Sequence, residues 1–382
     1  MAQVSQFSGD GLGILLYNES VRGIGIGKSA ISLADSFFIE SYNPATWSNF
    51  KRVSLCGAMN IKNISDPIGY NTTYFKFMGF SFGFPVSRNV GIVMGIRPEA
   101  RAKFTSNFKS SVDLGDTIKY SSNVDVDGGL SRFYLGTGYR KSANMHLGFG
   151  LGYVIGNYKQ VVSTDIEDDG SYDSYLEKYN EIIGRYFNFG AMFEIANTRF
   201  LVYTDINIGS RMRKIYHYFY CDIDSTGSYE DINLYSIYGF GLNKKFGKNR
   251  LINFELRYTD VSEDIFKKVY FIKKSKSKDS FFLSGGYEKA YRIKAKGKYY
   301  NRLSLRTGLF YHKYPNLTAN LKNEYGITFG FGYEFNYNSS RIDVSIVYSK
   351  RKGYFFKNIN ENMITINIGV STGEVWFVKI RK

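Results

Sequence analysis

Regular alternation between residues 128 and 156 is the feature that most constrains how this chain can fold. Large apolar residues occupy one parity of the second half, and glycines with one histidine occupy the other: Met145, Leu147, Phe149, Leu151, Tyr153 and Ile155 against His146, Gly148, Gly150, Gly152 and Gly156. Successive side chains of a strand point to opposite faces, so one face is apolar and the other nearly bare. A water-soluble sandwich would place charge on its outer face. This pattern instead indicates a strand with lipid outside and a crowded lumen inside.

The same alternation recurs along the chain from residue 50 onward, in about fourteen segments. The last three are the plainest, with apolar faces over 325–335, 342–348 and 364–370. Tight links follow the second, fourth, sixth, eighth and twelfth segments, at 87–89, 141–144, 196–198, 247–249 and 338–340. Links after odd-numbered segments are mostly long and polar. Short turns at one end and long loops at the other are typical of outer-membrane barrels.

We therefore predict an all-β fold, an antiparallel transmembrane β-barrel of about 14 strands in the outer membrane. Both termini and the short turns would then be periplasmic, and the long loops extracellular. No apolar run approaches the roughly 18 residues that a spanning helix needs. The 382 residues include only five prolines and no linker, which favours one continuous architecture.

The net charge of +16 raises the question of nucleic-acid binding. The lysines lie mainly in loops, at 273–278 and 294–298, rather than along one face. We therefore expect no nucleic-acid partner. Solvated loops are the simplest reading of these clusters, and lipid phosphates or an acidic partner are the alternatives.

Residues 1–48 differ from the rest of the chain because they are rich in glycine and alternate poorly. We predict two units, 1–48 as a segment inserted in the lumen and 49–382 as the barrel, with a short helix within 29–38. The run Gly23-Ile24-Gly25-Ile26-Gly27 has the spacing of a dinucleotide loop without the strand and helix that such a loop needs. No cofactor is expected. The start, Met1-Ala2-Gln3, carries no leader pattern, so export is inferred from the barrel pattern alone.

Charged and glycine residues of lumen parity are the candidate functional residues of the wall. They are Arg97, Arg132, Arg140, Gly148, Gly150, Gly152, Glu255, Arg257, Arg306 and Glu334. Charges on this face meet water or one another rather than lipid. The glycines leave volume that the first 48 residues would fill. We expect ion pairs across the lumen to hold that segment in place.

Catalytic and metal sites are not indicated. The three histidines, His146, His217 and His312, show no triad or metal spacing. A hydrolase at the barrel rim would need His217 or His312, which we place in or near loops. Cys56 and Cys221 lie far apart in sequence, and no disulfide is expected.

The order of N-terminal motifs resembles a known family. A glycine-rich start with Gly23–Ala30, then Asn43-Pro44-Ala45-Thr46-Trp47, then a long barrel is similar to the FadL-type long-chain fatty-acid transporter superfamily. The resemblance implies a fourteen-strand barrel plugged by an N-terminal hatch. It assigns Asn43, Pro44 and Ala45 to that hatch, where the glycines Gly23, Gly25 and Gly27 would take part in gating.

Two functions follow from this resemblance. The first is passive uptake of hydrophobic, fatty-acid-like molecules, gated by the hatch. The second is a non-transporting barrel that serves as a structural or carrier subunit of a secretion or outer-membrane assembly complex. The expected partners are outer-membrane lipid and lipopolysaccharide, other complex subunits, and the barrel-insertion machinery. The last is suggested by Gly373–Phe377, which resembles the aromatic terminus that this machinery reads.

Overall fold

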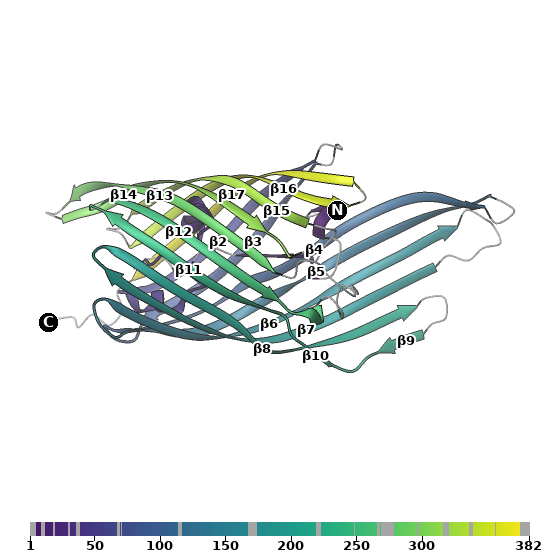
Figure 1. The fold of residues 1–382 in the computed structure, drawn as a ribbon, viewed down its shortest axis with the longest axis horizontal. Coiled ribbons are helices and arrows are strands. Elements are labelled where there is room, and N and C mark those ends of the chain that lie inside the picture. The colour runs from purple at the N-terminus through teal and green to yellow at the C-terminus, as the bar shows by residue number, and fades with distance from the viewer. Residues whose placement is uncertain are drawn as a thin grey trace.

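The chain forms a closed antiparallel β-barrel (Figure 1). The computed structural model describes residues 5–8, 12–17, 20–29, 31–35, 39–66, 69, 71–113, 117–166, 174–218, 223–247, 249–265, 268, 279–295, 298–315, 321–335, 339–355 and 357–374. In these ranges fourteen strands build the wall: β2 (Val53–Ser65), β3 (Asn71–Pro85), β4 (Val90–Asp113), β5 (Thr117–Arg140), β6 (Met145–Ile166), β7 (Ser174–Ile195), β8 (Thr198–Tyr218), β11 (Tyr235–Phe246), β12 (Arg250–Val261), β13 (Ser280–Ala295), β14 (Lys298–Lys313), β15 (Leu321–Phe335), β16 (Ser340–Phe355) and β17 (Lys357–Glu374). Pairing of β8 with β11 and of β17 with β2 closes the ring. The predicted fourteen-strand barrel is confirmed.

Side-chain exposure follows the predicted alternation. Phe149, Leu151 and Phe329 point outward with more than half of their surface exposed, at 55%, 60% and 55%, as expected of residues that face lipid. Met78 departs from the pattern. It has the same parity as the outward-pointing Phe80, yet it points inward and is buried. Gly79, with φ +139°, and a register shift in the ladder between β2 and β3 reverse the parity at this point.

The two sides of the wall differ in length. Strands β4 to β8 have 21 to 24 residues, whereas β11 to β17 have 12 to 18. The long strands project beyond the others at the end that carries the long links, toward the right of Figure 1. We call this projecting sheet the extension.

Several segments predicted to be loops are strands. The polar segment 98–127, of which only the later part is expected to prolong a strand above the membrane, lies almost wholly in β4 and β5. The segment 210–233, expected as a long loop, contains the end of β8 with the short strands β9 (Ile223–Thr226) and β10 (Glu230–Ile232). The predicted connection 288–300 is strand in β13 and β14. These predictions were wrong because the backbone ladder continues where apolar alternation is weak. Beyond the lipid both faces of a strand can be polar, and in β13 a register shift between Tyr291 and Arg292 interrupts the parity.

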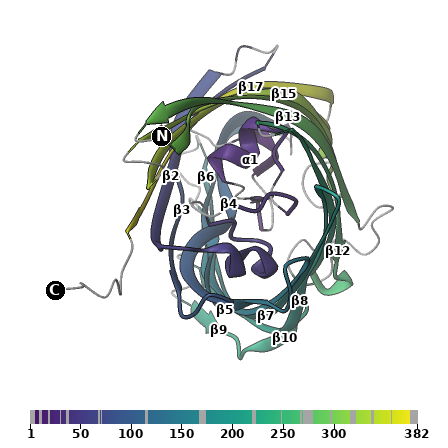
Figure 2. The same ribbon diagram turned by 90° about the vertical axis from the view of Figure 1, so that its left-hand side faces the viewer.

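The N-terminal segment lies inside the ring (Figure 2). It contains the 3-10 helices η1 (Gln6–Ser8) and η2 (Pro44–Asn49), the two-residue strand β1 (Ile14–Leu15) and the helix α1 (Val21–Gly25). The helix predicted within 29–38 is not present in the described residues of that range. There the backbone N–H groups of Ile31 and Ser32 donate to the carboxylate of Glu255 instead of to a helical turn. None of the described helices has the length and apolar character of a membrane-spanning helix.

A seam separates two neighbouring wall strands. Within the described residues the ladder between β3 and β4 runs only from Phe80–Ile96 to Pro85–Gly91. Toward the extension β4 instead pairs with β1, where Ile14 lies opposite Arg101 and Leu15 opposite Ala100. A strand of the inserted segment therefore lines the inner side of this seam.

Candidate functional site

The inserted residues 5–50, which we call the plug, rest on a row of glycines on one side of the lumen. Gly91, Gly138, Gly148 and Gly190 are consecutive cross-strand partners on β4 to β7, and we call them the glycine floor. A Cβ atom at Gly148 would lie 2.3 Å from the Pro44 carbonyl carbon, and one at Gly190 would lie 2.1 Å from Asn43 Oδ1. The Pro44 backbone and the Asn43 side chain therefore lie directly against the wall backbone, at distances that leave no room for a Cβ atom.

The Asn43-Pro44-Ala45 element is the part of the plug that sits on this floor. Asn43 caps η2, since its side-chain oxygen accepts a hydrogen bond from the Ala45 N–H at 3.1 Å. Pro44 occupies the first helical position, where its missing N–H costs nothing. Trp47 Nε1 donates to the Glu40 carbonyl at 2.7 Å, and Arg140 of the wall donates to the Ser48 carbonyl at 3.2 Å. The element is thus locally rigid and joined to the wall.

The predicted gating glycines occupy a second contact on the opposite side of the lumen. Gly27 has φ +83°, and its N–H donates to Thr328 Oγ1 at 2.9 Å. The same hydroxyl donates to the Gly25 carbonyl at 3.1 Å. A Cβ atom at Gly308 would lie 2.3 Å from the Gly27 nitrogen. Gly23 belongs to the capped turn of α1, where its N–H donates to Ser20 Oγ at 3.0 Å.

Six charged residues join the plug to the wall near this contact. Arg22 and Asp35 come from the plug, and Glu288, Arg306, Arg341 and Asp343 come from β13, β14 and β16; we call them the charged seat. The N···O distances are 2.7 Å for Arg22–Asp35, 2.8 Å for Arg22–Glu288, 2.7 Å for Arg306–Glu288, 2.6 Å for Arg306–Asp343, and 2.7 Å for both Arg341–Asp35 and Arg341–Asp343. Cations and anions alternate around this chain of contacts, so each buried charge has opposite charges beside it.

Further charges fix the middle of the plug. Lys28 pairs with Glu324 at 2.9 Å, and Arg351 holds the same carboxylate at 2.9 Å. Arg257 donates to the Lys28 carbonyl at 3.1 Å, and Glu255 accepts from the Ile31 N–H at 2.7 Å. Glu255 and Arg257, both predicted to line the lumen, therefore bind plug backbone.

The remaining predicted residues lie on the inner side of the wall. Arg97 donates to the Ser41 carbonyl at 3.0 Å. Arg132 pairs with Glu99 at 2.8 Å and with Asp205 at 2.5 Å, above Gly152. The other two are near neighbours of wall residues: Gly150 lies beside Asn188, and Glu334 is buried opposite Arg341 in the ladder of β15 and β16.

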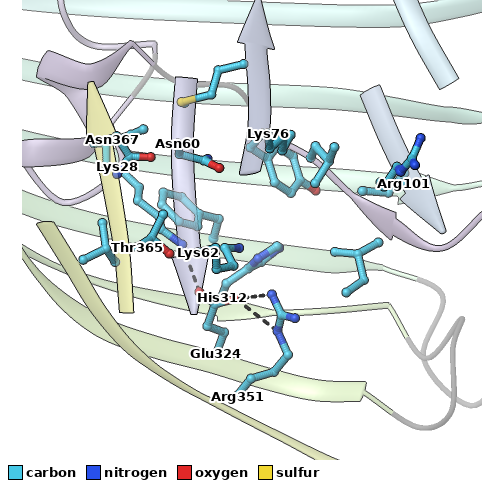
Figure 3. Close-up of a pocket in the computed structure, with 18 of the residues that line it drawn as sticks. Lys28, Asn60, Lys62, Lys76, Arg101, His312, Glu324, Arg351, Thr365 and Asn367 are labelled. Atoms are coloured by element: carbon cyan, nitrogen blue, oxygen red, sulfur yellow. Dashed lines mark hydrogen bonds and ion pairs between the residues drawn. The ribbon is translucent and has the colours of Figure 1, made fainter. Parts of the chain in front are cut away.

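A small polar cavity remains beside the seam (Figure 3). Its volume is about 100 Å³, enough for a few water molecules. Charged side chains line much of it, including Lys28, Lys62, Glu324 and Arg351. Figure 3 shows Glu324 reached from two sides by Lys28 and Arg351. Such a lining suits water or ions better than an oily molecule.

Burial perturbs one carboxyl of the plug outside the membrane-spanning strands. Burial raises the pKa of Glu40 to about 8, although the Ser20 hydroxyl that donates to it opposes the shift. The side chain is only 2% exposed. Glu40 is therefore largely protonated at neutral pH.

The histidines occupy structural positions. His146 contacts Ser48 Oγ of the plug through Nδ1 at 2.6 Å. His312 is buried in β14, one residue before that strand ends, and contacts Ser280 Oγ at 2.8 Å. His217 lies in β8, in the extension. Cys56 is buried, and Cys221, lysines 273–278 and Val375–Phe377 fall outside the described residues.

Sequence reasoning identified Arg306 but missed most of the charged seat and most of the glycine floor. Arg22 and Asp35 are charges in a segment otherwise rich in small and apolar residues, which is a signal of buried pairing that could have been used. Arg341 lies at the short-turn end of β16 and Glu288 in the middle of β13, each just outside the predicted alternation. The cross-strand row of glycines becomes visible only once the register is known.

Comparison with known proteins agrees with this architecture. The toluene transporter TodX of Pseudomonas putida aligns with 94% of this chain and 99% of its own, at TM-score 0.59 and 13% identity. A FadL homologue of Pseudomonas aeruginosa aligns over the same shares, at TM-score 0.61 and 11% identity. At these identities the likeness establishes the fold. No curated protein matches the sequence. The family model described as BamG matches residues 1–382, so the chain belongs to the BamG family.

Proposed function

We propose that this protein is a permanently plugged outer-membrane barrel that serves as a non-transporting, structural subunit of a multi-protein complex of secretion or outer-membrane assembly. The observation that carries the proposal is the attachment of the plug to both sides of the lumen. The glycine floor contacts its backbone on β4 to β7, and the charged seat holds it on β13 to β16.

The energetics disfavour a plug that moves. Two buried ion pairs of the charged seat, Arg22–Glu288 and Asp35–Arg341, connect plug and wall directly. Leaving a buried charge without its partner costs about 3–5 kcal/mol. Displacing the plug would break both contacts together, although Arg22 and Asp35 would stay paired with each other and Glu288 would keep Arg306, so the cost is less than the sum of two unpartnered charges. A passage that depends on this movement would need cargo to supply that free energy.

The orientation follows from the loop asymmetry. We assign the short-turn end to the periplasm and the long-loop end to the cell exterior, as in other barrels. On this assignment β17 ends on the periplasmic side. Ser5 and Ser8, however, donate hydrogen bonds to Glu361 and to the Lys103 carbonyl toward the exterior end, so the expectation that both termini are periplasmic does not hold for the described N-terminal residues. The extension, formed by β4 to β8, would rise above the membrane and present a large sheet to partner proteins. We assign no catalytic role, since His146 and His312 make buried contacts with Ser48 and Ser280.

Purification from native membranes tests this proposal. The full-length protein, solubilised in a mild detergent, should elute with other envelope proteins in fixed stoichiometry. When the membranes are treated with a chemical cross-linker before solubilisation, the residues cross-linked to partner proteins should lie in the extension, including residues 174–183 of β7. A barrel that elutes alone from native membranes under several mild detergents would contradict the proposal.

A second function is favoured by the seam. The limited ladder between β3 and β4 leaves a side opening covered from within by β1, and the cavity lies behind it. This arrangement would suit uptake of hydrophobic, fatty-acid-like molecules if the plug shifted. The neighbour TodX is named as a toluene transporter. Deletion of residues 4–48 should then raise flux of a hydrophobic probe into proteoliposomes. An unchanged flux would count against transport.

A further inference from the structure

Three basic side chains share the lipid-facing surface at the short-turn end of β11 to β13. Lys244 and Arg250 are exposed, and Lys289 is half-buried. Their parities match those of outward-pointing neighbours: Phe240 for Lys244, Ile252 for Arg250 and Tyr291 for Lys289. We call these three residues the basic cluster.

The register brings two of these charges together. Arg250 and Lys289 are direct cross-strand partners on β12 and β13. The Ala290 N–H donates to the Asn249 carbonyl at 2.8 Å, so the adjoining pair of Arg250 and Lys289 is of the closely spaced, non-hydrogen-bonded kind. Like charges placed directly opposite one another are destabilising unless an anion lies between them. Among the described residues no carboxylate forms an ion pair with Lys244, Arg250 or Lys289.

Aromatic rings set the depth of the basic cluster in the membrane. Lys244 Nζ lies 5.3 Å from the Phe246 ring centroid, and Lys289 Nζ lies 4.8 Å from that of Tyr291. Phe246 and Tyr291 are 42% and 41% exposed on the outer surface. Aromatic side chains are enriched at the boundary between acyl chains and headgroups, and Phe246 ends β11 while Tyr291 lies near the short-turn end of β13. The cations are thus at headgroup level.

The cluster is local rather than part of a basic belt around the barrel. Outward residues at the same end of other strands include the uncharged Tyr139 on β5, Leu147 on β6 and Val370 on β17, and the exposed charge at the end of β17, Glu374, is acidic. An acidic partner protein would not require aromatic neighbours at the lipid boundary. The setting therefore favours lipid.

We propose that the basic cluster binds the phosphate of a glycerophospholipid in the adjacent leaflet. The Arg250 guanidinium offers a planar fork to two phosphate oxygens, and the two ammonium groups neutralise the remaining charge. Flanking apolar residues such as Ile252 and Ile293, each 44% exposed, would contact the acyl chains. Assignment to the periplasmic leaflet rests on the orientation proposed above, whereas the site itself does not.

The test measures binding of phosphatidylglycerol to the purified full-length barrel in a nonionic detergent, by native mass spectrometry. A triple variant, Lys244→Gln, Arg250→Gln and Lys289→Gln, should bind about 100-fold more weakly, because each cation near anionic lipid contributes about fivefold. The matched control, Lys51→Gln, Arg88→Gln and Lys141→Gln, removes three exposed charges at the same end of the barrel and should bind within about twofold of wild type. Arg250→Lys alone should give an intermediate loss. The heat-dependent gel mobility of a folded barrel should be the same in all variants.

Several outcomes would overturn the site. One is an equal loss of phosphatidylglycerol binding in the triple variant and in its control. Another is that the barrel binds inorganic phosphate and phosphatidylglycerol does not compete for it. A third is that the barrel binds lipopolysaccharide selectively. Loss of an acidic partner protein in the triple variant, with lipid binding unchanged, would assign the cluster to that partner instead. Elution of the barrel without partners would contradict the proposed function and leave the lipid result untouched.

Discussion

The plug is held by two contrasting attachments on opposite walls of the lumen. On β4 to β7 the glycine floor removes side chains, and η2 rests on bare backbone. On β13 to β16 the charged seat uses long side chains that bridge the gap through alternating charges. The first attachment depends on shape and tolerates no added atom. The second depends on charge balance and tolerates no lost partner. The two attachments of the plug thus have separate physical origins, one in shape and one in charge.

Removing one charge from the charged seat should have the largest effect. Glu288→Gln leaves Arg22 and Arg306 without their shared carboxylate, at a cost of about 3–5 kcal/mol. Hydrogen exchange of the α1 amides should rise accordingly. The control is Glu181→Gln, which breaks the more exposed pair with Arg213 in the extension and should cost about 1 kcal/mol or less. Equal effects of the two variants would contradict the proposed role of the charged seat.

Adding one methyl group to the glycine floor should have the next largest effect. Gly148→Ala places Cβ against the Pro44 carbonyl carbon, and such overpacking costs about 1–3 kcal/mol. Hydrogen exchange of the backbone amides should rise in residues 43–50, whereas the amides of α1 should stay protected. Gly57→Ala is the matched control, because its Cβ would meet only a Phe80 ring atom at 4.0 Å. If α1 loosened as much as η2, the two attachments would not be separate.

Removing the cap of η2 should have a smaller effect. Asn43→Ala deletes the acceptor for the Ala45 N–H, which typically costs about 1 kcal/mol. Asn43→Ser keeps a capping oxygen and should restore most of the protection. Exchange rates of the Ala45 and Thr46 amides are the readout. No difference between Ala and Ser at this position would rule out capping as its role.

The last effect is confined to one titrating group and depends on pH. The pKa of Glu40 is raised to about 8 by burial, above its ordinary value of 4.5. Its contribution to stability is therefore fully present below about pH 4.5 and is lost as pH rises through about 8. The thermal unfolding temperature of the wild type should fall across this pH range relative to that of Glu40→Gln. Parallel pH profiles of the two proteins would contradict a protonated Glu40.

Much of the barrel could be predicted from the sequence because lipid imposes a parity that each strand must show. Phe149 and Phe329 illustrate this, since both are exposed on the outer wall. The prediction failed in the extension, where residues such as Ser122 and Thr164 pair in a ladder with no lipid to select their character. It failed again within 29–38, where Glu255 replaces helical hydrogen bonds.

The site was partly predictable for a similar reason. Arg306 and Glu255 were identified because a charge of lumen parity must find a partner. Which partner it finds depends on barrel register and on the path of the plug, as the pairing of Arg22 with Glu288 shows. Neither the register nor the path of the plug follows from the local sequence pattern.

Locking the plug in place tests the central claim most directly. Ser29 Oγ of the plug lies 3.1 Å from Ser284 Oγ of β13, so cysteines at both positions can form a disulfide. The pair would be introduced with Cys56→Ala and Cys221→Ala. We predict that the oxidised, cross-linked barrel retains its partner proteins as fully as the reduced form. Loss of those partners on oxidation, or hydrophobic uptake that appears only after reduction, would show that the plug must move and would contradict the account.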